Sequence, residues 1–380
     1  MIRQKLNVKV LLSLLILFVF TLTTVDADAQ SRRKKRQQEE EAKKKAEAAQ
    51  QAKKPAAKKG GIQPFDKVIT SEAETDEGLF NVHVLDKKYF FEIPNDLLGR
   101  DMLMVTRIAK TASGIGFGGG KTNTQMLQWE RVQDQINVRI ISTVVTADDD
   151  LPIAEAVENS NFAPILASFP IKALSKDSSG VVVDVTSLLT SDVKPLGLPQ
   201  RYRTQYRVTR LDNSRSYIQR ASSYPENIEL RHVKTYNAGN SPSARADGSI
   251  SVEMSNSMIL LPEEPMQRRL ADRRVGWFAR GTTDYGLDAQ QSKQVRYLDR
   301  WRLEVKDEDI EKFKRGELVE PKEPIVYYVD RATPDQWRQA IKDGIEDWQV
   351  AFEAAGFKNA IIAADPPSKE EDPDWSPEDV

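Results

Sequence analysis

Alternation with the period of a β-strand is the feature that most constrains this chain. From Val82 to about residue 305, short apolar runs are separated by turn-forming residues. The stretch NVHVLDKKYFFEIP predicts two strands that turn at Asp86-Lys87-Lys88, and Pro94 ends the second strand. The runs MLMVTRIA, TQMLQWERV and QINVRIISTVV extend this pattern into an antiparallel meander. We therefore expect an α+β fold with a β-rich, antiparallel N-terminal region.

Several segments inside this region are less regular. The run VVVDVTSLL predicts a buried strand that leads into a short helix, and residues 152–174 are expected to be partly helical. From Arg201 to Val208, arginines alternate with tyrosine, threonine and valine. This period of two predicts a half-exposed strand.

After Pro321 the period changes to that of a helix. Thr333, Pro334 and Gln336 have the pattern of a helix start, with a capping residue, a first-turn proline and a capping-box glutamine, and Gly356 marks the end. The intervening sequence predicts one amphipathic helix of about 22 residues. Its apolar core face comprises Trp337, Ile341, Ile345, Trp348 and Phe352. The runs PIVYYVD and KNAIIAAD predict a strand on either side of this helix.

The first 29 residues have the composition of a secretory signal peptide. Three basic residues precede an apolar run at 10–20, and Ala27 and Ala29 form an A-x-A cleavage pattern. Cleavage would make Gln30 the first mature residue and would place the protein in the periplasm, the cell envelope or the medium. An uncleaved membrane anchor is the alternative.

The next segment, 30–61, is a basic low-complexity linker. Residues 31–59 contain 12 Lys and Arg against four Asp and Glu, a net charge of +8, and almost no large apolar side chain. Such a segment predicts a solvated spacer, with weak contact to anionic membrane surfaces as an alternative. Residues 60–380 instead have a net charge of −11, which argues against a nucleic-acid partner.

Cysteine is absent, and the only histidines are His83 and His232. Disulfides, thiol nucleophiles and a three-imidazole metal site are therefore excluded within this sequence. The glycines from Gly114 to Gly120 loosely resemble a nucleotide-binding loop, but the run that follows predicts a strand rather than the required helix. We interpret them as a hairpin tip and identify no catalytic or metal-binding residue.

Several long strings nevertheless resemble one family in the same order along the chain. They include GLFNVHVLDKKYFFEIPNDLLGRDMLMVTRIA, GGGKTNTQMLQWERV, SRSYIQRASSYPENIEL and PIVYYVDRATPDQWRQAIKDGIEDWQVAFEAAGFKNAI. Over residues 65–380 the sequence resembles bacterial secreted zinc-dependent metalloproteases of metzincin type, which carry two uncharacterised domains before the catalytic domain.

The resemblance implies a domain order. It comprises a signal peptide (1–29), the linker (30–61), a small N-terminal domain (62–112), a β-rich domain of uncharacterised role (113–320) and the start of the catalytic domain (321–380). The family binds zinc through H-E-x-x-H, which this sequence lacks. The resemblance therefore implies that zinc and the protein or peptide substrate are bound in a longer parent protein, and that this chain alone is inactive. It also implies that the apolar helix stripe from Trp337 to Phe352 is partly uncovered.

The sequence is also compatible with two other hypotheses of function. One is a non-enzymatic, β-rich binding module of the envelope or medium, and the other is a tethered envelope protein with 31–59 as its spacer.

Overall fold

Antiparallel strands dominate the computed structural model, which describes residues 61–242, 248–286, 291–373 and 375–378. The chain divides into Met1–Gly61 and Ile62–Val380, and every element described below lies in the second unit. The predicted signal-cleavage residues Ala27, Ala29 and Gln30, and the basic segment 31–59, lie outside the described residues. Among the helices of the described ranges, none is both long and apolar enough to cross a membrane.

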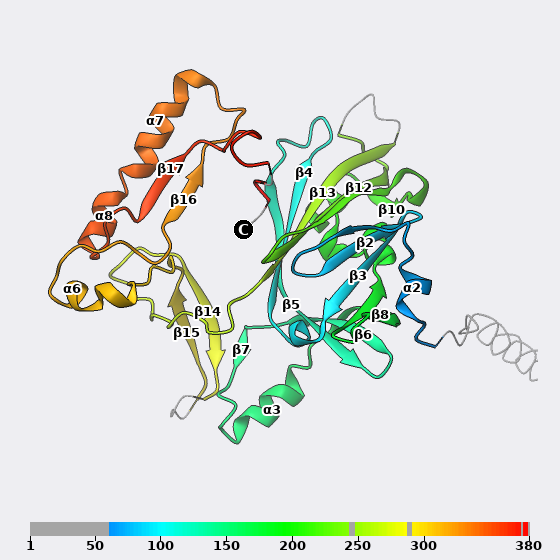
Figure 1. Ribbon diagram of the computed structural model, residues 1–380, viewed down its shortest axis with the longest axis horizontal. Helices are drawn as coiled ribbons and strands as arrows, with labels where there is room; N and C mark the ends of the chain where they lie inside the picture. The colour runs from blue at the N-terminus through cyan, green and yellow to red at the C-terminus, as the bar shows by residue number, and fades with distance from the viewer. Residues whose placement is uncertain (1–60, 243–247, 287–290, 374, 379–380) are drawn as a thin grey trace, which may run out of the picture. The chain divides into compact units, whose positions relative to one another are not determined.

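One large sheet contains twelve strands in the order β1-β2-β3-β9-β8-β6-β5-β4-β13-β12-β10, with β11 also paired to β12 (Figure 1). All pairings in this sheet are antiparallel. Its strands are β1 (Glu74–Asp76), β2 (Asn81–Leu85), β3 (Lys88–Pro94), β4 (Met102–Lys110), β5 (Gly120–Val132), β6 (Gln135–Ile141), β8 (Ile165–Leu174), β9 (Gly180–Asp184), β10 (Val208–Leu211), β11 (Tyr217–Ser223), β12 (Asn227–Ala238) and β13 (Ser249–Leu260). The expected α+β fold with a β-rich, antiparallel region is confirmed.

Tight hairpins connect neighbouring strands where the sequence predicts turns. Asp86 and Lys87, between β2 and β3, have φ angles of 50° and 64°, and Gln133, between β5 and β6, has a φ of 55°. Positive φ at these positions matches the twist of the flanking antiparallel strands. The glycine-rich segment forms the loop between β4 and β5, where Gly119 has a φ of 87°. A strand follows this loop, as predicted.

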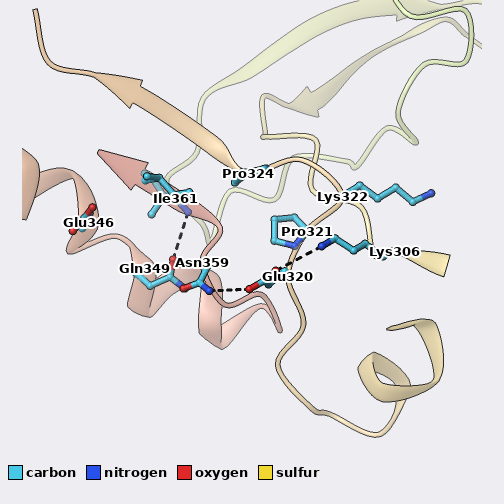
Figure 2. Close-up of a pocket in the computed structure, with 10 residues that line it drawn as sticks. Lys306, Glu320, Pro321, Lys322, Pro324, Glu346, Gln349, Asn359 and Ile361 are labelled. Atoms are coloured by element: carbon cyan, nitrogen blue, oxygen red, sulfur yellow. Dashed lines mark hydrogen bonds and ion pairs between the residues drawn. The ribbon is translucent and has the colours of Figure 1, made fainter. Parts of the chain in front are cut away.

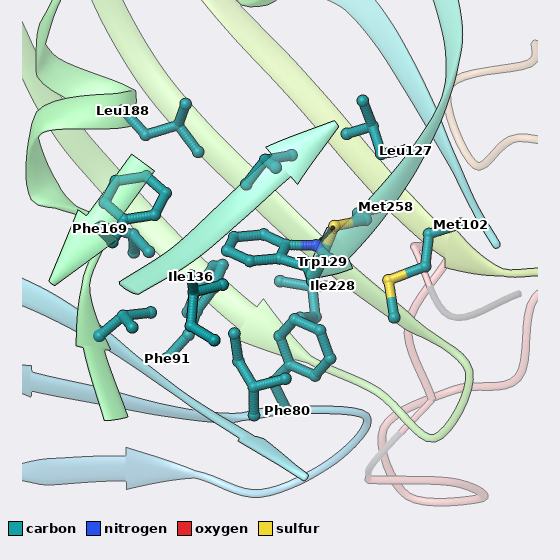
Figure 3. Packing of buried hydrophobic residues seen from close by; sticks show 14 of the residues in the cluster. Phe80, Phe91, Met102, Leu127, Trp129, Ile136, Phe169, Leu188, Ile228 and Met258 are labelled. Atoms are coloured by element: carbon teal, nitrogen blue, oxygen red, sulfur yellow. Dashed lines mark hydrogen bonds between the residues drawn. The ribbon is translucent and has the colours of Figure 1, made fainter. Parts of the chain in front are cut away.

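The main apolar core surrounds Trp129 on β5 (Figure 3). The centroid of its ring system lies 5.7 Å from that of Phe80, 5.9 Å from that of Phe91 and 6.1 Å from that of Phe169. The indole N–H donates a hydrogen bond to the sulfur of Met258 at 3.3 Å. These partners come from segments far apart in the sequence, so the core depends on the order of strands in the sheet.

Helices and short turns lie between the strands. The α-helices are α2 (Phe65–Val68), α3 (Ile153–Ser160), α4 (Thr186–Thr190), α5 (Gln200–Gln205), α6 (Ile310–Lys314), α7 (Asp335–Glu346) and α8 (Gln349–Ala354). The 3-10 helices are η1 (Asn95–Leu97), η2 (Lys194–Leu196), η3 (Asn213–Arg215) and η4 (Asp307–Asp309).

The predicted strand from Arg201 to Val208 is wrong, because most of this segment forms helix α5. Tyr202 and Tyr206 stack with their ring centroids 6.1 Å apart, and Arg203 forms two hydrogen bonds to the Asp192 carboxylate at 2.6 and 2.7 Å. A spacing of four residues brings side chains together on a helix, whereas period two does not require a strand in so short a segment.

The C-terminal strand, helix and strand arrangement is present. Strands β16 (Ile325–Tyr328) and β17 (Ile361–Ala364) pair in parallel, with α7 and α8 between them in the chain. The predicted single helix is interrupted, because the Trp348 amide donates to Ile345 O, three residues back, in a tighter turn. A third sheet contains β7 (Val145–Thr146), β14 (Ala279–Asp284) and β15 (Lys293–Leu298).

Candidate functional site

Strands β12 and β13 carry a buried polar face. Arg231 lies opposite Ser255 and Glu229 lies opposite Ser257, and Glu253 follows the same alternation. These side chains face away from the apolar core, yet Glu229 is only 3% exposed and its two serine neighbours and Glu253 are also buried. We call these five residues the polar sheet face. Buried charges need partners, so their contacts decide what this face can bind.

Arg231 is the centre of the polar sheet face. Its Nε lies 3.3 Å from Glu229 Oε1, its Nη1 lies 3.5 Å from Glu253 Oε1, and its Nη2 donates to Glu378 Oε1 at 2.6 Å. Lys110 on β4 pairs with the second oxygen of Glu253 at 2.6 Å. One guanidinium thus contacts three carboxylates, two from the sheet and one from a segment 147 residues further along the chain.

The environment shifts the acidity of Glu229. Desolvation by burial raises the pKa of Glu229 above its usual value, and the nearby Glu378 carboxylate adds to this rise. The hydrogen bond from the Ser255 hydroxyl and the charge of Arg231 act in the opposite direction. Burial therefore favours the neutral form of Glu229, whereas Ser255 and Arg231 favour its carboxylate form.

The arrangement is suited to binding a carboxylate rather than to nucleophilic catalysis. A serine nucleophile requires a base that accepts its proton and is itself oriented by a third group. Ser255 is only 5% exposed, so a substrate cannot reach its hydroxyl, and the nearest histidine in sequence, His232, lies on the opposite face of β12, where its Nε2 contacts Asn256. Guanidinium groups, in contrast, bind carboxylates with strong charge-assisted hydrogen bonds.

The two histidines lie in separate environments. His83 contacts Thr75 at 2.8 Å and Glu92 at 3.1 Å. The hydrogen bond between His83 and Glu92 is the main reason that the pKa of Glu92 is lowered to about 2. Burial lowers the pKa of His232 to about 3. Within the described ranges, no three His, Asp or Glu side chains are grouped so that they could hold a metal ion. His83 and His232 therefore do not fit the histidine ligands of a metzincin zinc site.

A second buried charged cluster has a structural role. Lys234 donates to the backbone oxygen of Ser191 at 2.5 Å, and burial lowers its pKa to about 8. Nearby, Tyr236 and Arg203 both contact Asp192, and burial raises the pKa of Tyr236 to about 12. Each of these groups is used to hold the segment before α5 against β12.

The predicted apolar stripe on the C-terminal helices is largely open. Trp337, Ile341 and Trp348 are 57%, 41% and 64% exposed, whereas Ile345 and Phe352 are half-buried. Phe352 packs with the small cluster around Val319 and Phe357. Among the stripe residues, Phe352 is therefore the one that packs in an apolar cluster of the described ranges.

A hollow of about 510 Å³ lies where α7, α8 and β17 meet the segment after α6 (Figure 2). Its polar groups pair with one another. Glu320 accepts from Asn359 at 3.0 Å and lies 3.6 Å from Lys306, and Gln349 accepts from the Ala360 amide at 3.0 Å. These contacts join the loop to β17, which is a structural role.

The polar sheet face was missed by reasoning from the sequence. In ENIELRHVKTYN, Glu229 and Arg231 alternate with apolar residues, which is also the pattern of an ordinary solvent-facing strand surface. No local signal indicates that residue 378 covers this surface. The serine-rich odd positions of β13, including Ser255 and Ser257, are the one hint of a buried polar layer.

The fold is that of a β-rich α+β protein, and its polar sheet face contacts the carboxylate of Glu378 in the same chain. Residues 62–111 match the family described as domain of unknown function (DUF5118), and residues 119–306 match domain of unknown function (DUF5117). The expectation of two uncharacterised domains is thus confirmed in this coarser form. Strands β1–β4 come from the first match and β5–β15 from the second, so the large sheet contains strands of both. No curated protein and no solved structure matches the chain.

Proposed function

We propose that this chain is the N-terminal portion of a secreted or periplasmic zinc-dependent metallopeptidase of metzincin type. In this proposal residues 62–320 form a non-catalytic module and residues 321–380 begin the catalytic domain. Zinc would activate water for peptide-bond hydrolysis, through ligands outside this sequence. The observation that carries the proposal is the parallel unit β16, α7, α8 and β17, which has the element order expected from the resemblance.

The open surface of this unit supports the proposal. Parallel strands are normally covered on both faces, and a two-stranded sheet is marginal alone. Here Val326, Tyr328 and Ile362 are 41%, 48% and 37% exposed. Together with the open stripe at Trp337 and Trp348, this surface is suited to further elements of a larger domain.

The test is the natural coding sequence. The DNA after the codon for Val380 should encode a helix with H-E-x-x-H, and the complete product should bind one zinc ion and cleave casein. A chelator such as 1,10-phenanthroline should abolish the cleavage. A stop codon directly after Val380, or robust zinc-dependent proteolysis by residues 30–380 alone, would overturn the proposal.

Export is part of the same proposal. A signal peptide at 1–29 predicts that N-terminal sequencing of the envelope or medium fraction begins at Gln30. Retention of Met1 together with recovery in the membrane fraction would instead support the tethered envelope protein. The basic segment 31–59 is proposed to add only weak attraction to anionic lipid surfaces.

A non-enzymatic binding module is the second candidate. The polar sheet face favours it, because Arg231 there holds the carboxylate of a peptide segment. If this candidate is correct, the full-length natural protein should contain no zinc and should bind acidic peptides.

A further inference from the structure

The segment 375–378 lies against the large sheet through contacts of several kinds. The Glu378 carboxylate contacts both Arg231 and Arg220, and the Asn227 amide donates to the Glu378 main-chain oxygen at 2.7 Å. The Tyr224 hydroxyl contacts the Ser376 hydroxyl at 2.8 Å. Although Glu378 belongs to an irregular segment, its side chain is only 13% exposed. Side-chain and main-chain atoms are therefore both recognised, which is typical of a peptide-binding site.

The charges of the sheet match this occupant. Four cations lie at the polar sheet face and its rim: Arg107, Lys110, Arg220 and Arg231. The sheet itself supplies two carboxylates, Glu229 and Glu253, to these cations. The cations therefore outnumber the sheet carboxylates, and the Glu378 carboxylate adds a third negative charge. A neutral or basic residue at position 378 would leave Arg231 with Glu229 and Glu253, but it would remove the carboxylate that contacts both Arg220 and Arg231.

The same segment also contacts the C-terminal strands. The Trp375 ring lies 5.3 Å from that of Tyr328 on β16 in an edge-to-face arrangement, and the Arg331 guanidinium lies 5.8 Å from the Trp375 ring centroid. Segment 375–378 thus contacts β16 through its tryptophan and the sheet through its glutamate.

We infer that the outer face of β11 and β12, with Arg231 at its centre, is a binding site for an acidic peptide segment, and that its occupant is this chain's own segment 375–378. The segment acts as a strap that fastens the part of the chain after β17 to the large sheet. This inference does not depend on the proposed peptidase function, because it concerns contacts within the described residues.

Hydrogen–deuterium exchange of the full chain tests the inference. The variant Glu378→Gln removes the charge but keeps the shape, and Glu370→Gln is the matched control, because Glu370 is an exposed acid of the same region. We expect the amides of 366–378 to exchange at least about tenfold faster in Glu378→Gln than in the wild type. Peptides covering 227–231 should also lose protection, and Glu370→Gln should match the wild type.

The second variant, Arg220→Gln, guards against loss of folding, because Arg220 contacts the same carboxylate from a side chain that is 48% exposed. It should raise exchange in 366–378 in the same direction, while β4 and β5 keep their protection. Equal exchange in Glu378→Gln and the wild type would overturn the inference. So would an equal loss of protection in Glu370→Gln, or a dimer in light scattering that depends on Glu378, since the occupant would then belong to a second copy.

Discussion

Replacement of Arg231 by methionine is the perturbation that probes the polar sheet face most directly. The variant keeps an apolar stem but leaves two sheet carboxylates and Glu378 around it. The Glu229 and Glu253 side chains are 4% and 9% exposed, so neither can regain water. Breaking a buried ion pair by removing one partner costs about 3–5 kcal/mol. We expect a loss of this size in the free energy of unfolding at pH 7.

The pH dependence of this loss follows from the sign of the shift at Glu229. Burial raises the pKa of Glu229, so the folded state binds the proton more tightly than the unfolded state. Its contribution to stability therefore falls as pH rises from the unfolded value of about 4.5 through the folded pKa. Loss of Arg231 removes an influence that lowers this pKa. The cost of Arg231→Met should consequently be larger at pH 7 than at pH 4.5.

Urea unfolding followed by tryptophan fluorescence measures this cost. Arg220→Met is the matched control, because it contacts the same Glu378 carboxylate from a half-exposed position and should cost less than about 1 kcal/mol. Adding Glu229→Gln to Arg231→Met should restore part of the lost stability. Stability of Arg231→Met within about 1 kcal/mol of the wild type, or an equal cost for Arg220→Met, would refute the reasoning.

Three further predictions concern other parts of the chain. The hydrogen bond from His83 lowers the pKa of Glu92 to about 2, so its stabilisation is present above about pH 4.5 and is lost as pH falls toward 2. Glu92→Gln should therefore cost about 3 kcal/mol at pH 7 and about half of that at pH 3 in urea titrations, and an equal cost at both would contradict this. Trp129→Ala should cost about 3–5 kcal/mol by the same assay, because the indole is 1% exposed, and a loss below about 1 kcal/mol would argue against its central place in the core. Trp337→Lys combined with Trp348→Lys should at least halve the fluorescence of the apolar dye ANS with the folded chain, and unchanged dye binding would show that the open stripe is not the sticky surface.

Local features of the sequence determined much of the fold. The turn at Asp86 and Lys87 depends on nearby residues, so it could be predicted without knowledge of the rest of the chain. The helix was also expected near its observed start, but the predicted cap at Thr333 is wrong, because Pro334 occupies the cap position and no side chain caps the helix. Strand periodicity over 82–260 likewise predicted the antiparallel class, because alternation reports which side chains can reach a core. The C-terminal strand, helix and strand were predicted for the same reason.

Tertiary contacts decided the remainder. Strand β9 lies between β3 and β8 in the sheet, a position that its local sequence does not indicate. Helix α5 forms in place of a predicted strand, and there Arg203 contacts Asp192, which lies outside the short alternating pattern. The polar sheet face likewise depends on tertiary contacts. A charged residue on a strand predicts a solvent-facing side chain, but Arg231 is half-buried and contacts Glu378, which lies 147 residues later in the chain. Short-range sequence patterns cannot report this contact, since it is made only when the chain has folded.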